Sequence, residues 1–205
     1  QKKLVREYSE NQNLPEWFAI AVLLYLSDND WEEYDKLWDD YLEKRKAENK
    51  RGSIQRDLVE LILLRKFIAM TAIPKTIELV EDAIENGQKV IIFTSFTDEL
   101  NELAEHFGKL CVTHNGLMSD KEKQKSVDAF QNNPKKKIFI GNIKSAGVGI
   151  TLTEATVVVF NSFDWVPGIN EQAEDRAYRI GQKNCVNVFY QLFEKTISTR
   201  MWEVL

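Results

Sequence analysis

The sequence predicts an α/β protein in which helices cover both faces of a mainly parallel sheet, behind a mostly helical N-terminal segment. The sequence contains recurring short apolar runs, which are typical of strands buried on both faces. Most of the stretches between these runs show helical spacing of apolar residues. The four prolines and nine glycines are too few for a long linker. Strands that alternate with helices form parallel sheets through right-handed crossovers. The expected strands are Lys89–Ser95, Leu110–His114, Lys137–Gly141, Thr156–Asn161 and Val186–Leu192.

Residues 1–73 form the first of two predicted regions and differ in pattern from the rest. Trp17–Leu26 is a continuous apolar run that fits either a buried strand or a core helix. Between Asp30 and Leu42 apolar residues recur three and four apart, which predicts an amphipathic helix with acids on its outer face. The polar stretch Glu43–Ser53 is expected to end that helix in an exposed loop, and Ile54–Met70 resumes a helical pattern.

Residues 74–205 form the second predicted region, the regular α/β part. Pro74 suits the first turn of a helix that ends at Gly87. Thr97 is expected to cap the next helix, which ends near Gly108.

Two further helices follow in this region. Ser119 and Glu122 form a capping-box pattern that opens a helix to Phe130, and another is expected from about Ile169 to Ile180. In open parallel sheets, ligands bind beyond the carboxyl ends of the strands. The loops in which chemistry is expected therefore follow Ser95, His114, Gly141 and Asn161.

The charge of the chain is concentrated in one stretch. The 205 residues carry a net charge of −5, from 32 acidic and 27 basic residues. Between Asp28 and Asp40, seven acids accompany one base, so this stretch carries −6 and the remainder +1. This argues against a protein that is basic overall but not against a local basic site.

Composition also excludes several classes of protein. Two cysteines and two histidines supply neither a disulfide framework nor a zinc-ligand pattern, so we predict no metal site and a reducing compartment. The longest apolar run, ten residues, is about half of a membrane span, and no signal peptide precedes it. The chain begins at Gln1 rather than Met, which indicates a piece of a longer protein.

The predicted helix 169–180 carries the strongest chemical pattern. At 100° per residue, Gln172, Asp175, Arg176 and Arg179 gather on one side. Two guanidinium groups one turn apart suit phosphate oxygens, but a solvated face laced with ion pairs fits the same spacing. The opposite, core-facing side is expected to hold Ile169, Ala173, Ala177 and Ile180.

The loop 142–153 contains Gly147 and Gly149, which allow a ligand to approach the backbone closely. Lys144 and Ser145 add donors that suit phosphate. A purely geometric role in a strand–helix turn fits the glycines equally well. Trp165 stands at the tip of the next turn, at the same end of the sheet.

Some chemistry is missing from the sequence. It contains no G-x-x-x-x-G-K-[ST] pattern, so it cannot assemble a complete nucleotide site alone. It also lacks a Ser/His/Asp or Cys/His constellation, which excludes nucleophilic hydrolases.

Five strings resemble the second RecA-like lobe, and the segment before it, of superfamily 2 helicase-like ATPases of the SWI/SNF type. QAEDRAYRIGQ is similar to that family's motif VI, SAGVGITLT to motif V and IIFTSF to motif IV, and the upstream strings LPEWFAIAVLLYLSDNDWEEYDKL and LRKFIAMTAIPKTIELVEDAIENGQKVIIF extend the resemblance over nearly the whole chain. It implies a three-layer RecA-like lobe behind an inter-lobe segment. Thr151, together with WVPGINEQAEDR, is closer to the annealing-helicase and fork-remodelling branch than to chromatin remodellers, and Ala146 replaces a usual glycine.

The resemblance also implies roles for individual residues. Arg176 and Arg179 resemble arginine fingers that reach the γ-phosphate of ATP across the inter-lobe cleft. The expected ATP-binding residues are Gln172, Gly147, Gly149 and Asp175. The expected DNA-backbone contacts are Ser95, Asn142 and Lys144, with Trp165 coupling the DNA groove to the ATP site.

The expected function is that of the second motor lobe of an ATP-dependent translocase on duplex or forked DNA. The first, N-terminal RecA-like lobe would supply the phosphate-binding loop and the Mg²⁺ site, so this chain alone should be inactive and bind DNA weakly. The expected compartment is intracellular: the cytoplasm of a prokaryote or virus-infected cell, or a eukaryotic nucleus. Two alternatives are a non-catalytic lobe that binds DNA or a partner, and the second lobe of a sugar-nucleotide glycosyltransferase.

Overall fold

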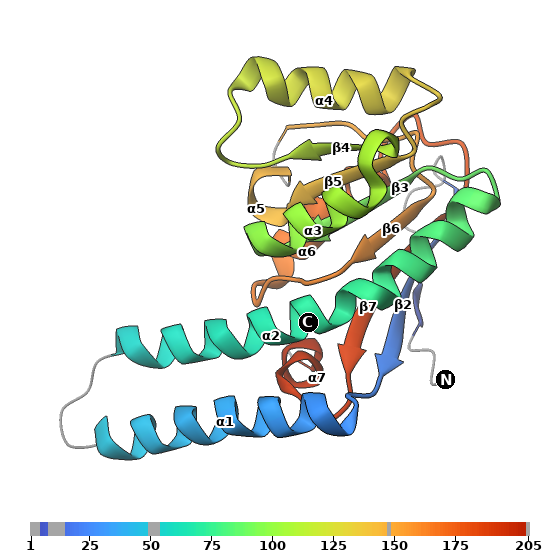
Figure 1. Cartoon of the computed structure of the whole chain (residues 1–205). Coiled ribbons are helices and arrows are strands. Elements are labelled where there is room, and N and C mark those ends of the chain that lie inside the picture. The colour runs from blue at the N-terminus through green and yellow to red at the C-terminus, as the bar shows by residue number, and fades with distance from the viewer. Residues whose placement is uncertain (1–4, 8–14, 49–53, 147–148, 204–205) are drawn as a thin grey trace.

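A computed structural model describes residues 5–7, 15–48, 54–146 and 149–203 of the chain (Figure 1). It confirms the predicted α/β fold: within these residues one sheet forms in the order β1-β2-β7-β6-β3-β5-β4. All neighbouring strands are parallel except the edge strand β1, which is antiparallel to β2. The strands are β1 (Val5–Glu7), β2 (Trp17–Leu24), β3 (Val90–Thr94), β4 (Cys111–His114), β5 (Ile138–Asn142), β6 (Val157–Phe160) and β7 (Val186–Phe193).

Helices cover both faces of this sheet, as predicted. The C-terminal half of α2, together with α3, packs on one face, and α4, α5, α6 and α7 pack on the other. The described helices are α1 (Asp28–Glu48), α2 (Ile54–Glu85), α3 (Thr97–Phe107), α4 (Asp120–Asn132), α5 (Ile143–Ala146), α6 (Pro167–Glu174) and α7 (Ile197–Trp202), with a 3₁₀ turn η1 (Gly108–Leu110).

The centre of the sheet is the driest part of the molecule. Every residue of β3 and β6 is buried, which explains their continuous apolar sequences, because helices exclude water from both sides. The rings of Phe160 and Tyr190 stack with centroids 4.3 Å apart, and Phe93 lies 5.1 Å from Phe160. This rigid centre holds the carboxyl ends of the strands, and the loops that follow them, in fixed positions.

The helices α1 and α2 form an arm that extends beyond the sheet (Figure 1). The aromatic stripe of α1 faces inward as predicted: Tyr34 is buried, its ring packs against Trp38 and Phe67, and its Oη accepts a hydrogen bond from the Ile197 N–H of α7 at 2.8 Å. Most of the acids between residues 28 and 40 are exposed. The acidic stretch therefore lies on the outside of the arm, away from the sheet.

Three predictions for the N-terminal region need completion or correction. The apolar run Trp17–Leu26 contains the strand β2 (Trp17–Leu24), which pairs in parallel with β7. The helix end expected within Glu43–Ser53 is confirmed, because α1 ends at Glu48, whereas the loop expected after it falls on residues 49–53, outside the described residues.

The prediction that a new helix starts at Pro74 is also wrong, because Pro74 lies inside the continuous helix α2. Proline removes one helical hydrogen bond, but Ala72, Ile73 and Val80 are fully buried around it and keep the helix packed on the sheet. The predicted boundary between residues 73 and 74 falls within this helix, and a division of the chain there stays a prediction.

The predicted helix 169–180 is shorter than expected. α6 ends at Glu174, and residues 175–181 form turns and bends. Ala173 and Ala177 are buried as predicted, but Ile180, expected on the core side, is 86% exposed. The helical-wheel argument therefore does not hold beyond Glu174, and the positions of the two arginines have another cause.

Candidate functional site

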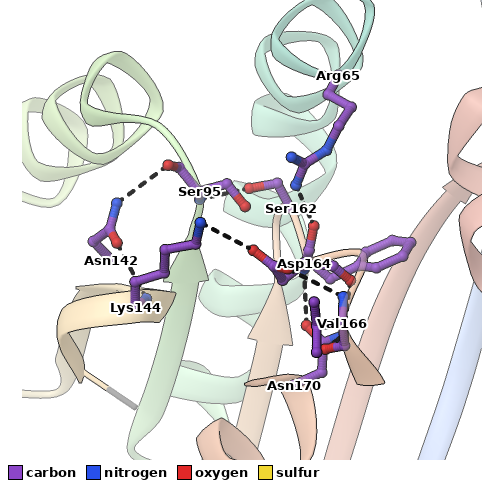
Figure 2. A network of polar contacts seen from close by, with 9 residues as sticks. Arg65, Ser95, Asn142, Lys144, Ser162, Asp164, Val166 and Asn170 are labelled. Atoms are coloured by element: carbon purple, nitrogen blue, oxygen red, sulfur yellow. Dashed lines mark hydrogen bonds and ion pairs between the residues drawn. The ribbon is translucent and has the colours of Figure 1, made fainter. Parts of the chain in front are cut away.

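Three loops meet at the carboxyl edge of the sheet, and they carry the four residues predicted to contact DNA (Figure 2). Ser95 follows β3, Asn142 ends β5 and Lys144 lies in α5. Asn142 Nδ2 donates to the Ser95 carbonyl at 3.2 Å, and its Oδ1 accepts from the Lys144 N–H at 3.2 Å. The parallel sheet thus brings together residues that lie far apart in the sequence.

Trp165 is connected to this group through its neighbour Asp164, which Figure 2 shows facing Lys144. Lys144 Nζ lies 3.7 Å from Asp164 Oδ2, and the lysine side chain is 72% exposed while that of Asp164 is 7% exposed. Asn170 of α6 holds the same loop: its Oδ1 accepts from Asp164 N–H at 2.8 Å and its Nδ2 donates to Asp164 O at 2.9 Å. Asp164 Oδ1 also accepts from the Val166 N–H at 3.1 Å.

Gly141 allows α5 to fold back closely on β5. A Cβ at this position would lie 2.7 Å from Ala146 Cβ and 2.9 Å from the Phe139 ring, closer than real carbon atoms approach. The absence of a side chain there therefore sets the path of the chain just before Lys144.

Glu99 of α3 ties the loop after β3 to the loop after β6, a role that the sequence analysis missed. Its carboxylate accepts hydrogen bonds from the N–H groups of Ser95 and Phe96, at 2.5 and 2.7 Å, and from Ser162 Oγ at 2.6 Å and the Asn161 amide. Burial raises its pKa, while these donors oppose the rise. The expected Thr97 cap is wrong: Phe96 is the N-cap residue, and Glu99 satisfies the free N–H groups there.

These contacts also decide how Ser95 is presented. Its Oγ is buried and has no hydrogen-bond partner among the described residues, and its N–H is held by Glu99 and by Ser162 Oγ. The exposed donor of the predicted DNA set is therefore the Lys144 ammonium, with the indole of Trp165 38% exposed beside it.

The second predicted cluster, the arginine pair, lies on the turn that follows α6. Arg176 Nε donates to Gln172 O at 2.9 Å, and its Nη1 donates to Ile150 O at 3.4 Å. Arg179 is exposed, and its Nη1 donates to Thr151 Oγ1 at 3.3 Å. Both guanidinium groups therefore reach the loop after β5 even though no helix continues through them.

Gln182 holds this turn against the loop. Its buried Nε2 donates to the carbonyls of Thr153, Ala155 and Ala177, at 3.0, 2.9 and 3.2 Å. Its Oε1 accepts from the N–H groups of Lys183 and Asn184. Gln182 closes the string QAEDRAYRIGQ, yet the sequence analysis gave it no role, because spacing does not show that an amide is buried.

The electrostatics of the turn depend on burial and on mutual charge. Desolvation lowers the pKa of Arg176, and the nearby charge of Arg179 lowers it further, whereas Asp175 raises it. Desolvation raises the pKa of Asp175, which Arg176 opposes and Glu171 reinforces. The turn therefore presents a compact group of cations in which Asp175 partly balances the charge.

Of the two glycines in the predicted ATP-binding loop, the structure describes only Gly149. Gly149 is exposed and has φ +73°, a left-handed conformation that favours glycine. Gly147 lies outside the described residues. Gln172 and Asp175 are both exposed on or beside the last turn of α6, so the structure brings the described members of the predicted ATP set to one region.

The donor chemistry of this region fits an anion. Guanidinium, amide and hydroxyl donors gather near Gly149, and the described residues contain no group of three or more His, Cys, Asp or Glu side chains that could hold a metal ion. Phosphate oxygens suit such donors, whereas Mg²⁺ requires oxygen ligands.

Among the residues that the structure describes, no helix has the length and apolar character needed to cross a membrane.

Comparison with protein families identifies the family of the chain and the residues that match it. Residues 72–181 match the family model described as "Helicase conserved C-terminal domain". The chain belongs to this helicase family. The match includes both clusters, from Ser95 to Arg179, but ends just before Gln182.

Two curated relatives are similar to most of this chain. An "Uncharacterized ATP-dependent helicase" of Mycoplasma pneumoniae is 34% identical over 62% of this chain and 13% of its own length. A Caenorhabditis elegans homologue of "SWI/SNF-related matrix-associated actin-dependent regulator of chromatin subfamily A-like protein 1" is 32% identical over 83% of this chain and 26% of its own length. The chain thus spans only a small part of each relative.

Solved structures confirm the RecA-like lobe. The "SWI2/SNF2 ATPase core domain" of Sulfolobus solfataricus superposes with a TM-score of 0.75 at 26% identity, over 95% of this chain and 43% of that one. The same core "in complex with dsDNA" gives a TM-score of 0.73 at 25% identity, over 91% and 43%. The predicted resemblance to the second lobe of SWI/SNF-type ATPases is therefore confirmed.

One pocket of the described lobe lies beside α6 rather than at the arginine turn. It has a volume of about 360 Å³ and shares Asp175 with the predicted ATP set, but neither arginine lines it. Tyr190 Oη donates to Glu174 inside it. The resemblance implies a nucleotide site between two lobes, and on that expectation a pocket within this single lobe would not mark it.

Proposed function

We propose that this chain is the second motor lobe of a DNA-stimulated ATPase that moves along duplex DNA. Its helicase C-terminal domain of the SWI/SNF type supports the assignment, as does a relative in structure that was solved with double-stranded DNA. The observation that carries the proposal is the pair of donor clusters at the ends of α6: a DNA-facing group before it and an arginine turn after it.

On this proposal Arg176 and Arg179 bind the γ-phosphate of an ATP molecule held mainly by the first lobe. The weak, long hydrogen bonds to Ile150 O and Thr151 Oγ1 are easily exchanged for phosphate oxygens, because bonds between a guanidinium and an anion are stronger than bonds to neutral acceptors. Residues of the first lobe would provide most of the Mg²⁺ ligands, and the ion would supply charge neutralisation at the phosphates. Gln172 and Gly149 border the same space.

On the DNA side, Lys144 supplies the exposed cation for a phosphate, while Asn142 and Ser95 fix the backbone around it. Such contacts position a protein on DNA without reading its sequence. Trp165 lies two residues before α6, so on this proposal a movement of the DNA at Trp165 is passed on to α6. Few exposed donors and a near-neutral lobe predict weak DNA affinity for this chain alone, falling further with salt.

Thr151 and the stretch 165–176 favour a role in strand annealing or fork remodelling over nucleosome remodelling. The corresponding compartment is the nucleus of a eukaryote or the cytoplasm of a prokaryote or virus-infected cell.

The test is an ATPase assay of the full-length protein with no DNA and with single-stranded, duplex and forked DNA. We expect turnover that rises with duplex or forked DNA, and no turnover from this 205-residue chain under the same conditions. Turnover by the chain alone would contradict the split site. A full-length protein without a phosphate-binding loop or ATPase activity would support the alternative, a non-catalytic lobe that binds DNA or a partner.

A further inference from the structure

One arginine of the arm reaches the DNA-facing loops. Arg65 lies on α2, outside the residues 72–181 that match the family model. Figure 2 shows its side chain descending from the helix, and its Nη2 donates to Phe163 O at 2.6 Å. Its Cζ lies 5.1 Å from the Trp165 ring centroid and 5.7 Å from that of Phe96. A single side chain therefore contacts the loops after β3 and β6 together.

The surroundings of Arg65 depend on the shape of its head group. A guanidinium is planar and delocalised, so it can lie against aromatic rings and donate in its own plane at once. Burial lowers its pKa, while the charges of Asp164 and Glu99 raise it. Lysine would keep the charge but not the plane, because its ammonium is a compact point charge.

The loop that carries Trp165 is held from three helices. Arg65 holds Phe163 from α2, Lys144 faces Asp164 from α5, and Asn170 binds the backbone of Asp164 from α6. Since α6 leads directly into the arginine turn, a displacement of this loop is transmitted to α6. Of the three contacts, only that of Arg65 comes from the α1–α2 arm.

We propose that Arg65 is a positioning residue that fixes Trp165 and thereby couples the α1–α2 arm to the DNA-facing loop. The proposal rests on the proposed function, in which Trp165 lies between the DNA and the ATP site. Removing Arg65 should weaken the stimulation of ATP turnover by DNA and leave ATP binding intact.

The first experiment measures the position of Trp165 directly, without activity. The chain has five tryptophans, so ¹⁹F NMR of the fluorotryptophan-labelled chain gives few signals, and the W165F variant assigns the one from Trp165. Arg65→Met should move the Trp165 signal and leave the remaining signals in place. The matched control is Lys66→Met, at the next position of α2, whose ammonium pairs with Asp98 rather than with the loop. An unmoved Trp165 signal in Arg65→Met would overturn the proposal.

The second experiment uses the full-length protein. Because a small misplacement of a coupling group lowers turnover strongly, Arg65→Met should reduce DNA-stimulated ATP turnover by about ten-fold or more, with KM for ATP changed by less than about two-fold. The double variant with Arg65→Met and W165F should lower DNA-stimulated ATP turnover little more than either single change, since both changes remove the same coupling. Additive losses would overturn the proposal.

Arg65→Lys separates positioning from charge. It should resemble Arg65→Met in both experiments, and wild-type behaviour would show that charge alone is required. If Arg65→Met does not fold, which its thermal denaturation reveals, Arg65→Lys carries both tests. A wild-type protein without DNA stimulation would contradict the proposed function, whereas the Trp165 signal would still decide the role of Arg65.

Discussion

The two clusters at the ends of α6 are held in different ways. The loops after β3, β5 and β6, which we propose face DNA, are interlocked by side chains from α2, α3, α5 and α6, among which Glu99 and Asn170 are buried. The arginine turn is held mainly by one buried amide, Gln182, and its cations lie at or near the surface with hydrogen bonds of 2.9 to 3.4 Å.

This difference indicates a division of labour. Buried polar groups with satisfied hydrogen bonds fix a unique geometry, as a surface that follows DNA requires. Arg179 is exposed and donates a 3.3 Å hydrogen bond to Thr151 Oγ1, so we infer that it keeps the freedom to turn toward a ligand bound on another lobe. The predictions below test whether the first cluster is rigid and the second adaptable.

The largest effect is expected at the arginine turn. In the full-length protein, Arg179→Ala should lower ATP turnover by about 10³- to 10⁵-fold, the range for arginine fingers, because a cation that stabilises the transition state is lost. ATP binding should change by only a few-fold. Lys183→Ala, an exposed cation just beyond the turn, is the control. Normal turnover in Arg179→Ala would contradict the finger assignment.

The next effect concerns what holds the turn. Gln182→Ala leaves three buried carbonyls without their donor, so the free energy of unfolding should fall by about 2–4 kcal/mol. Urea denaturation of the chain measures it. Gln124→Ala removes an exposed amide on α4 and should change stability by less than about 0.5 kcal/mol. Equal stability of the two variants would show that Gln182 does not hold the turn.

A smaller effect is expected on DNA binding. Lys144→Ala should weaken duplex binding of the full-length protein uniformly across sequences and reduce the slope of log Kd against log salt by about 1, as expected for one lost phosphate contact. Lys135→Ala removes the same charge from an exposed position before β5, at the opposite edge of the sheet. If both variants bind alike, Lys144 does not contact a phosphate.

The smallest effect is a pH dependence at the end of β4. His114 is 1% exposed. Burial lowers its pKa from the ordinary 6.5; a hydrogen bond between the ring and the Ser145 backbone opposes this shift, and the charge of Lys123 reinforces it. As pH falls below about 7, the unfolded chain takes up this proton before the folded one, so the free energy of unfolding decreases, by at most about 1.4 kcal/mol per pH unit.

Urea denaturation between about pH 5 and 8, the range in which histidine changes its charge, checks this prediction. His114→Phe should remove part of the slope. An unchanged slope in His114→Phe would show that other groups cause it.

Much of the fold could be predicted from sequence because its signals are local. Continuous apolar runs marked β3, β5 and β6, and Ser119 and Glu122 form the predicted capping box at α4, with Ser119 Oγ accepting from Glu122 N–H. Pro74 misled the prediction, since the cost of a proline within a helix depends on how tightly its neighbours pack. The end of α6 was missed because Gly181, at φ +108°, and Gln182 act on the chain from beyond it.

The sequence by itself determined the order of most strands and helices of the α/β region, the family and the residue types of both clusters, because patterns of apolar and charged residues persist along the chain. Only the tertiary structure decided that Glu99, Gln182 and Arg65 hold those clusters. Burial and contacts between distant residues give these polar side chains their roles, and neither property is written in local spacing. For the same reason Ser95 Oγ proved to be buried while Lys144 faces outward.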